Sequence, residues 1–269
     1  MIASRGCAKL IRRVRGQNMI RIEGFKFRVL PLLLTVALGL GLPILGASIV
    51  YTAAIHFPQL HLPSPNGPLL PWLYAQHGAQ FVLALIAIAI VKIFVPADYG
   101  LHLPRGKTYC GTALAWGVFF GVLMTLVDYA PQLIAHTVPK LDYPLTAANV
   151  AGWLGFEGIY VGPTEEVLFR SLLVTFLAAT MPGRVRVGRY EMSVAGVAVA
   201  LIFALAHMES FSTEAWYLAL GQQIYAVALG ILYAYWLEKS KSIVAPILGH
   251  NASDVTEYAI LFAWVGLAG

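Results

Sequence analysis

Residues 29–55 read VLPLLLTVALGLGLPILGASIVYTAAI and contain no charged side chain. A helix of about 20 apolar residues is enough to cross the roughly 30 Å hydrocarbon core of a bilayer. The rest of the chain has the same character, since 59% of its 269 residues are hydrophobic and only 12% are charged. Soluble proteins carry about 25% charged residues. The sequence therefore predicts an integral membrane protein.

Six further apolar runs are long enough to cross a bilayer as helices, and they cover residues 71–95, 109–135, 149–180, 192–209, 216–237 and 243–267. Proline and glycine interrupt the connections between them, as in Pro182-Gly183. We expect an all-α, polytopic transmembrane bundle of about seven spans. It divides into a basic arm (1–28), N-terminal transmembrane helices (29–148) and a transmembrane core (149–269).

The distribution of basic residues predicts the orientation of this bundle. The arm holds eight lysines and arginines, and seven spans with a cytoplasmic N-terminus place 16 of the 18 on the cytoplasmic side. Lys140 lies outside and Arg170 falls within a span. The net charge of +5 is then explained by topology and anionic lipid headgroups, not by nucleic acid. We expect a multi-pass protein of the cell membrane whose arm is a solvated tail, with an amphipathic surface segment over 19–30 as the alternative.

Several ionisable side chains nevertheless fall within the apolar runs, where each costs about 2.5–3.5 kcal/mol on insertion scales. The candidates for chemistry are Glu165, Glu166, Arg170, His207, His250 and Asp254. We interpret a second set as interfacial: Glu157, Glu209 and Glu257. A third set is assigned to span ends or loops: His77, His102, Asp128 and His136.

The spacing of the first set indicates hydrolytic chemistry. Glu166 and Arg170 are four residues apart and share one helix face, whereas Glu165 projects about 100° away. Adjacent carboxylates repel in a low dielectric, so the arginine should neutralise one and leave the other able to take a proton from water. His207 and His250, from two other spans, could hold that water and stabilise an oxyanion.

At these residues the sequence resembles the CPBP family of intramembrane proteases, also called the ABI family, which includes the type II CAAX prenyl endopeptidases. The family signatures E-E-x-x-x-R, F-x-x-x-H and H-x-x-x-N/D are matched here by Glu165-Glu166-Val-Leu-Phe-Arg170, Phe203-Ala-Leu-Ala-His207 and His250-Asn-Ala-Ser-Asp254. The resemblance covers about residues 149–256.

The resemblance implies a membrane-embedded, glutamate-dependent endopeptidase without a cofactor. Glu165 would activate water, His207 would help to position it, and Arg170 with Glu166 would organise the carboxylate pair. His250 with residue 254 would stabilise the oxyanion. Asp254 stands where better-studied members have asparagine, and a carboxylate donates a hydrogen bond only when protonated. Asp254 is therefore either neutral or serves to orient His250.

Alternative functions are defined by the same residues. His207, His250 and Glu165 could form a zinc site of two histidines and one carboxylate, although the chain has no H-E-x-x-H helix and Arg170 would oppose a cation. The other alternative is a catalytically inactive scaffold or immunity-type protein.

For the protease, the expected partner is a protein or peptide substrate, lipidated or otherwise anchored in the membrane, together with membrane lipids. Cys7 and Cys110 lack metal-ligand spacing and are interpreted as incidental.

The predicted spans disagree about the depth of the two histidines. His250 would lie about 10 Å from the cytoplasmic end of its helix, whereas His207 would lie near the outer end of the fifth span. The fifth span is therefore expected to be irregular near residues 208–213, unless a boundary is misplaced.

Overall fold

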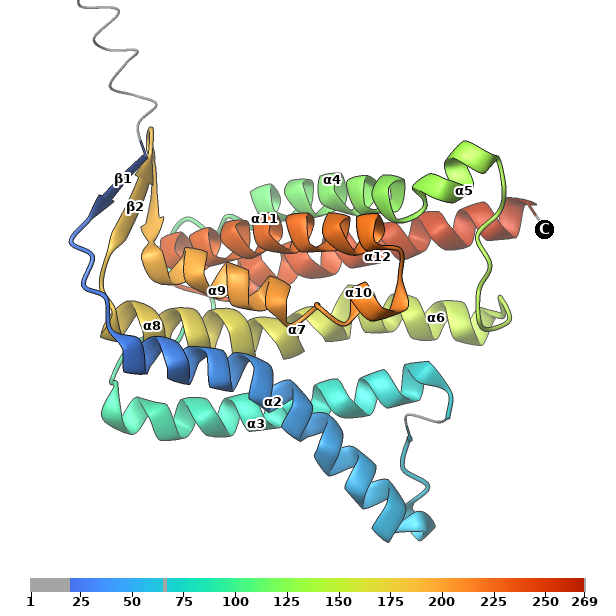
Figure 1. Cartoon of the computed structure of the whole chain (residues 1–269), viewed down its shortest axis with the longest axis horizontal. Coiled ribbons are helices and arrows are strands. Elements are labelled where there is room, and N and C mark those ends of the chain that lie inside the picture. Colours follow the sequence, from blue (N-terminus) through green and yellow to red (C-terminus); the bar gives the residue numbers. More distant parts are fainter. Residues whose placement is uncertain (1–19, 65–66, 269) are drawn as a thin grey trace, which may run out of the picture.

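The computed structural model describes residues 20–64 and 67–268, and it is mostly helical (Figure 1). Five helical segments among these residues are long and apolar enough to cross a membrane, namely Val29–His56 (α2), Leu69–Phe94 (α3), Cys110–Asp128 (α4), Val194–Thr213 (α9 and α10) and Trp216–Ser240 (α11). The chain therefore has the elements of a transmembrane helix bundle.

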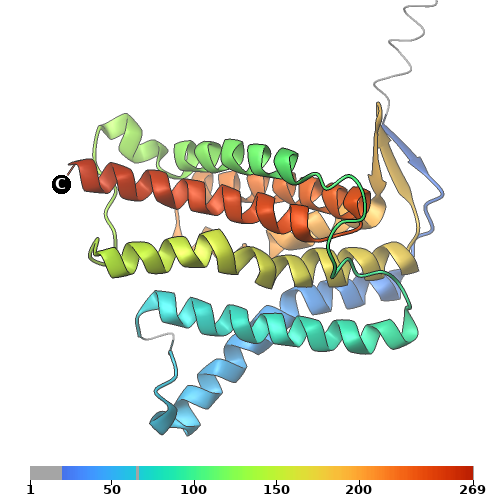
Figure 2. The same cartoon turned by 180° about the vertical axis from the view of Figure 1, so that it is seen from behind.

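Two further long helical stretches carry most of the candidate site. The first consists of α6 (Ala147–Gly155), α7 (Val161–Glu166) and α8 (Thr175–Thr180), joined by π-helical segments η2 (Phe156–Tyr160) and η3 (Val167–Val174). The second is α12 (Val244–Ala268). Figure 2 shows the α6–α8 rod lying between α12 and α3. The rod is thus surrounded by helices from both halves of the chain.

A small antiparallel sheet corrects the all-α prediction. Strands β2 (Arg184–Val187) and β3 (Tyr190–Ser193) form a hairpin between α8 and α9, and β1 (Ile20–Glu23) pairs with β2. The hairpin turns at Gly188, whose φ of 59° is unstrained for glycine. Residues 20–23 of the arm are therefore a strand rather than a tail or surface helix. The prediction for residues 1–19 lies outside the described residues.

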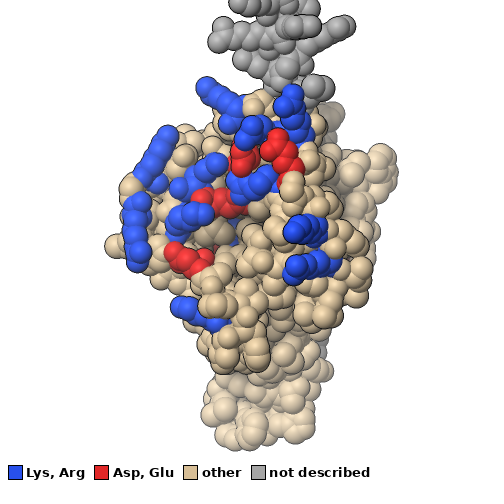
Figure 3. All heavy atoms as spheres, turned by 90° about the vertical axis from the view of Figure 1, so that its left-hand side faces the viewer, with Lys and Arg blue, Asp and Glu red and all other residues tan. Residues whose placement is uncertain are grey.

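The sheet marks the basic end of the bundle. The described lysines and arginines, apart from Lys140 and Arg170, belong to the strands, to the loops beside them and to the helix ends that meet there. Figure 3 views this end directly and shows basic side chains gathered around a hollow. Lysines and arginines of membrane proteins concentrate on the cytoplasmic side, which is called the positive-inside rule. The concentration of basic side chains at one end of this bundle follows the same pattern.

The loop between α3 and α4 is organised by an ion pair at this end. His102 lies 3.0 Å from Asp98, and the backbone N–H of Gly100 also donates to Asp98. The bond from His102 lowers the pKa of Asp98, followed in effect by the bond from Gly100. A bond to the carbonyl oxygen of Leu103 and the contact with Asp98 raise the pKa of His102.

Close packing of α4 on α12 depends on two glycines. A Cβ atom at Gly117 would lie 2.6 Å from the Cβ of Ala252, and one at Gly121 would overlap Ser253 and Thr256. A small-xxx-small spacing of this kind allows helix backbones to approach within a membrane. By contrast, a Cβ at Gly111 of the same helix would meet nothing.

Helix α9 (Val194–Leu205) is too short to cross a bilayer, because 12 residues span only about 18 Å. Figure 1 shows it ending near the middle of the α6–α8 rod, after which the chain turns into the short α10 (Ser210–Thr213). The expected irregularity in the fifth span is confirmed. It places His207 midway along the bundle, at the depth of the motif residues of the rod.

Candidate active site

A buried ion pair lies at the centre of the site. The Nε of Arg170 is 3.1 Å from Oε2 of Glu166, and both side chains are almost wholly inaccessible, at 1% and 0% exposure. The guanidinium carbon lies 4.4 Å from the ring centre of Phe203 and 5.0 Å from that of Tyr233. These aromatic faces attract the cation in a place where water cannot solvate it. The pairing predicted from the spacing is therefore present.

His250 extends this pair into a row of alternating charges. Its Nδ1 lies 2.8 Å from the second oxygen of Glu166, and its Nε2 lies 3.2 Å from Asp254. The ring stacks on Tyr233 at 5.5 Å. Ionised carboxylates only accept hydrogen bonds, so both ring nitrogens are satisfied when the imidazole is doubly protonated. This geometry fits Asp254 as the residue that orients His250, one of the two roles that the sequence left open.

Glu165 is the carboxylate that this row does not neutralise. Its Oε1 lies 3.3 Å from Nε2 of His77, and its Oε2 lies 3.9 Å from Nε2 of His250. Oε2 is buried without a hydrogen-bond partner among the described residues. Unpaired buried oxygens are costly, and Oε2 of Glu165 shares this state with Oδ1 of Asp128 and Oε1 of Gln222, which line a cavity together with Glu165.

His77 is a site residue that the sequence interpretation missed. It lies inside α3, not at a span end or in a loop, and its side chain is 14% exposed. Its Nδ1 must donate to the carbonyl oxygen of Leu73, 2.9 Å away, which directs Nε2 at Glu165. The edge of Phe156 packs against the ring at 5.1 Å and 89°. The available signal was an ionisable residue inside an apolar run.

Tyrosines fix the position of α3 beside the rod. Tyr160 donates to the carbonyl oxygen of Tyr74, and Tyr74 donates to that of Gly152, each at 3.0 Å. At Gly78 a Cβ would lie 2.6 Å from the hydroxyl of Tyr160, so the absence of a side chain permits this approach. His77 is thereby held in register with Glu165.

His207 follows α9 at the turn into α10. Its Nδ1 donates to the carbonyl oxygen of Phe203 at 2.8 Å, and its ring packs against the ring of Phe203. Gln223 of α11 donates to the carbonyl oxygen of His207 at 3.1 Å. The F-x-x-x-H spacing thus serves two purposes, because Phe203 holds His207 and also covers Arg170.

The motif helices are tied together beside the catalytic candidates. The backbone N–H of Gly162 donates to the side-chain oxygen of Asn251 at 2.8 Å. A Cβ at Gly162 would collide with that amide group. This contact holds α7 against α12 and so keeps Glu165 near His250.

Two cavities meet at Glu165 and His207. The first, of about 630 Å³, lies among α4, the rod, α11 and α12 and also reaches His250 and Asp254. The second, of about 580 Å³, lies among α2, α3 and the turn after α9 and includes His77. Four of the six predicted site residues therefore line these cavities, whereas Glu166 and Arg170 stay buried in their ion pair.

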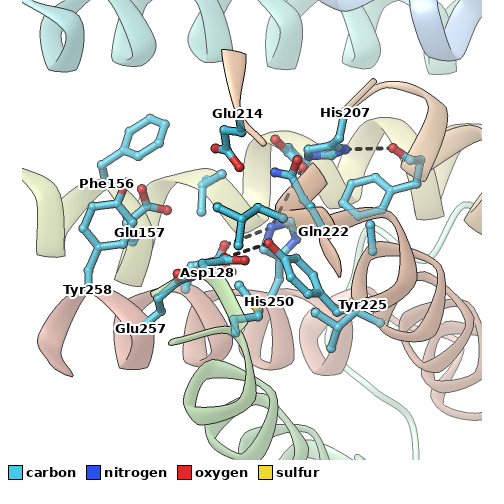
Figure 4. Close-up of a pocket in the computed structure, with 18 of the residues that line it drawn as sticks. Asp128, Phe156, Glu157, His207, Glu214, Gln222, Tyr225, His250, Glu257 and Tyr258 are labelled. Atoms are coloured by element: carbon cyan, nitrogen blue, oxygen red, sulfur yellow. Dashed lines mark hydrogen bonds and ion pairs between the residues drawn. The ribbon is translucent and has the colours of Figure 1, made fainter. Parts of the chain in front are cut away.

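The first cavity corrects the interfacial interpretation of two glutamates. Glu157 and Glu257 are only 7% and 8% exposed and line the cavity, as does Asp128, which accepts a bond from Tyr225 at 2.9 Å. Figure 4 shows Asp128, Glu157 and Glu257 on one side of this cavity and His207 on the other. Glu209, by contrast, is exposed and borders the second cavity. Among the residues that line the first cavity, as far as the chain is described, there is no lysine or arginine.

The described part of the chain contains no group of three or more His, Cys, Asp or Glu side chains arranged to hold a metal ion. Glu165, His207 and His250 share a cavity without meeting that requirement.

Residues 147–256 match the family model described as Type II CAAX prenyl endopeptidase Rce1-like. This matched segment, 110 of the 269 residues, is similar to that protease family. The match includes the six candidate residues at 165, 166, 170, 207, 250 and 254, while His77 lies outside it. Searches among curated proteins and among solved structures gave no match. The match to this family model supports a membrane protease in general terms and does not define the reaction.

Proposed function

We propose that this protein is an intramembrane endopeptidase in which Glu165 activates water to hydrolyse a peptide bond, without a metal cofactor. The observation that supports this most strongly is Glu165 itself, which lines the cavity shared with His207 and His250 and whose buried Oε2 has no hydrogen-bond partner among the described residues. Glu166 is already engaged by Arg170 and His250. We therefore assign the two carboxylates different roles: Glu166 is neutralised by its partners, and Glu165 is reactive.

The hydrogen bonds of the histidines suggest their roles. Because Nδ1 of His207 donates to Phe203, the Nε2 of a neutral His207 carries no proton and can accept a hydrogen bond from the attacking water. Glu165 takes a proton from that water as the water oxygen attacks the carbonyl carbon of the substrate's peptide bond. Doubly protonated His250, whose two N–H groups already bond to Glu166 and Asp254, stabilises the oxyanion that forms through its positive charge. Glu165 then delivers the proton to the leaving amine as the carbon–nitrogen bond breaks.

His77 serves as a positioning residue for Glu165. Its Nδ1 proton is committed to Leu73, so the contact between Nε2 and Glu165 requires a second proton shared by the two side chains. In the active form this proton resides on the imidazole, which leaves Glu165 ionised and directs its other oxygen at water. His77 acts on the reaction through Glu165 and not on the reacting atoms.

The two cavities suit a polypeptide substrate. An extended segment that lies through both passes Glu165 and His207, the residues that the cavities share. Entry between α2 and the turn after α9 would suit a substrate anchored in the membrane by a lipid or a helix. We infer that a protein or peptide of this kind is the substrate.

We further propose that all seven apolar helical stretches cross the cell membrane, with the N-terminus and the sheet in the cytoplasm and the C-terminus outside. The gathering of basic side chains at the sheet end supports this orientation. Single cysteines placed in the loops 136–146 and 182–183 and labelled with a membrane-impermeant maleimide would test it. Labelling of the first from outside and of the second only after permeabilisation is expected; the reverse pattern would refute the topology.

The catalytic proposal is tested with Glu165→Gln and His207→Ala in purified protein reconstituted into liposomes. Loss of the general base is expected to reduce cleavage of a membrane-anchored peptide by about 10²–10⁴-fold. Glu23→Gln, on an exposed strand, is the matched control. Full activity in both site variants would refute the assignment, and loss of wild-type activity on exhaustive chelation would favour the zinc route.

A further inference from the structure

A third cavity lies away from the candidate active site, at the basic end of the bundle. It measures about 950 Å³ and is bounded by the first turns of α4, by α9 and α11, and by the hairpin of β2 and β3. Volumes of roughly 300–1,000 Å³ are usual for sites that hold a small molecule. We call this cavity the hairpin groove.

Three tyrosines at the mouth of the hairpin groove each carry a cation. Tyr235 lies between Tyr109 and Tyr190, with ring centres 6.3 and 6.2 Å away. Lys107 is 4.8 Å from the ring centre of Tyr109. Arg189 is 5.1 Å from that of Tyr190, and Lys239 is 5.4 Å from that of Tyr235. The aromatic faces thus gather three positive charges around one opening.

The charge at this opening is not cancelled by nearby carboxylates. The acidic residue that lines the groove, Glu191, is held by Arg184 at 2.9 Å and by Arg186 at 2.7 Å. Those bonds lower the pKa of Glu191, with the bond from Arg186 contributing most. Its charge is therefore already balanced by other arginines. The three cations over the tyrosines have no carboxylate partner among the described ion pairs.

The groove changes from polar to apolar with depth. Lys107 precedes the first residue of α4, whereas Trp116 lies about 9 Å along that helix. Ile231 and Leu232 lie about 12–14 Å from the end of α11. The headgroup layer of a bilayer is only about 5–8 Å thick on each side. With the sheet end at the membrane surface, as proposed above, the cations would lie at the level of lipid headgroups and the apolar floor at the level of acyl chains.

We propose that the hairpin groove binds an anionic phospholipid, with its phosphate at Lys107 and Arg189 and one acyl chain along Trp116, Ile231 and Leu232. A phosphate monoanion complements the unbalanced charge of the mouth, and a hydrocarbon chain complements the floor. Basic pockets between helices at the cytoplasmic face are suited to such headgroups. This site is independent of the proposed proteolysis, and lipid binding can be measured without a substrate.

The test is native mass spectrometry of the full-length protein, delipidated in neutral detergent and titrated with phosphatidylglycerol or phosphatidylcholine of identical chains. Wild type should bind the first phosphatidylglycerol more tightly than phosphatidylcholine. Lys107→Ala/Arg189→Ala should weaken that event by about 10- to 30-fold. The control, Lys26→Ala/Lys92→Ala, removes the same charge at residues that do not line the groove.

Two further titrations identify the source of the bound group. Thr112→Trp places an indole in the groove and should weaken phosphatidylglycerol binding without removing any charge. Inorganic phosphate at matched concentration should compete poorly, because it lacks the chain. Equal losses in both double variants would overturn the proposal, since the effect would then be general electrostatics. Full competition by inorganic phosphate would also overturn it, because the site would then bind free anions.

Discussion

Replacement of His77 by glutamine tests whether α3, which lies outside the family-matched segment, takes part in the reaction. The glutamine amide can still donate to Glu165, but it cannot hold a titratable proton. A hydrogen bond to a charged group contributes about 1.5–3 kcal/mol. The His77–Glu165 contact of 3.3 Å is longer than the about 2.7–2.9 Å of strong charged bonds, so the lower value applies. Complete loss of this bond would correspond to about tenfold in kcat/KM, and His77→Gln, which keeps a neutral donor, should lose up to that amount.

The assay is cleavage of a membrane-anchored peptide in liposomes from pH 5 to 9, because a packing role would not change the shape of the pH profile. The groups that face this pair are His207 and His250, with Glu209 at the edge of the second cavity. These are unchanged in the variant. The pH profile of His77→Gln should therefore lose the change in rate that depends on the proton shared by His77 and Glu165. It should keep any change in rate that is due to the other groups.

His56 provides the matched control for this experiment. It lies in α2, and its Nδ1 contacts the carbonyl oxygen of Thr52 at 3.0 Å, the same four-residue tie that His77 makes to Leu73. His56→Gln should leave both rate and profile unchanged. If His77→Gln keeps the wild-type rate and profile while Glu165→Gln is inactive, His77 is only a packing partner of Phe156 and its positioning role is refuted.

Three other predictions concern the scaffold. Gly121→Val should lower the free energy of unfolding in SDS titrations by about 1–3 kcal/mol through overpacking against α12, whereas Gly111→Ala should be neutral or stabilising; equal effects would refute the packing argument. Arg170→Met should cost about 3–5 kcal/mol in the same assay by removing one of the two cations that pair with buried Glu166. Adding Glu166→Gln should recover part of this loss. Asp98→Asn should lower the pKa of His102, as followed by NMR titration, because the ring loses an ionic acceptor; an unchanged pKa would contradict the pairing.

The candidate residues were predictable because their spacing is local and their cost is high. Glu166 and Arg170 are adjacent on any helix, and a charge in an apolar run needs a partner. The same reasoning could not locate His77, since nothing in α3 reveals that Gly78 and Tyr160 bring it beside Glu165. Long-range partners depend on how helices cross, and the spacing within one helix contains no such information.

The sheet escaped prediction for a different reason. Its strands are four residues each, and β1 is separated from its partner β2 by more than 150 residues of sequence. So short a run in a basic, exposed segment gives little periodicity to detect.

Glu157 and Glu257 were misplaced for a third reason. An acidic residue toward a helix end looks interfacial unless the cavity beside it is known.

The break after α9 connects the fold to the proposed chemistry. A regular helix through residues 206–213 would carry the chain past the rod and would satisfy every backbone group within itself. In the turn the carbonyl oxygen of His207 instead accepts bonds from the backbone N–H of Ser210 at 3.3 Å, from the Ser210 hydroxyl at 2.8 Å and from Gln223 at 3.1 Å. Irregular backbone at membrane depth is tolerated only where protein covers it or a cavity adjoins it, and both cavities adjoin this turn. The same interruption therefore brings His207 to the depth of Glu165 and creates the space that water and a peptide would need.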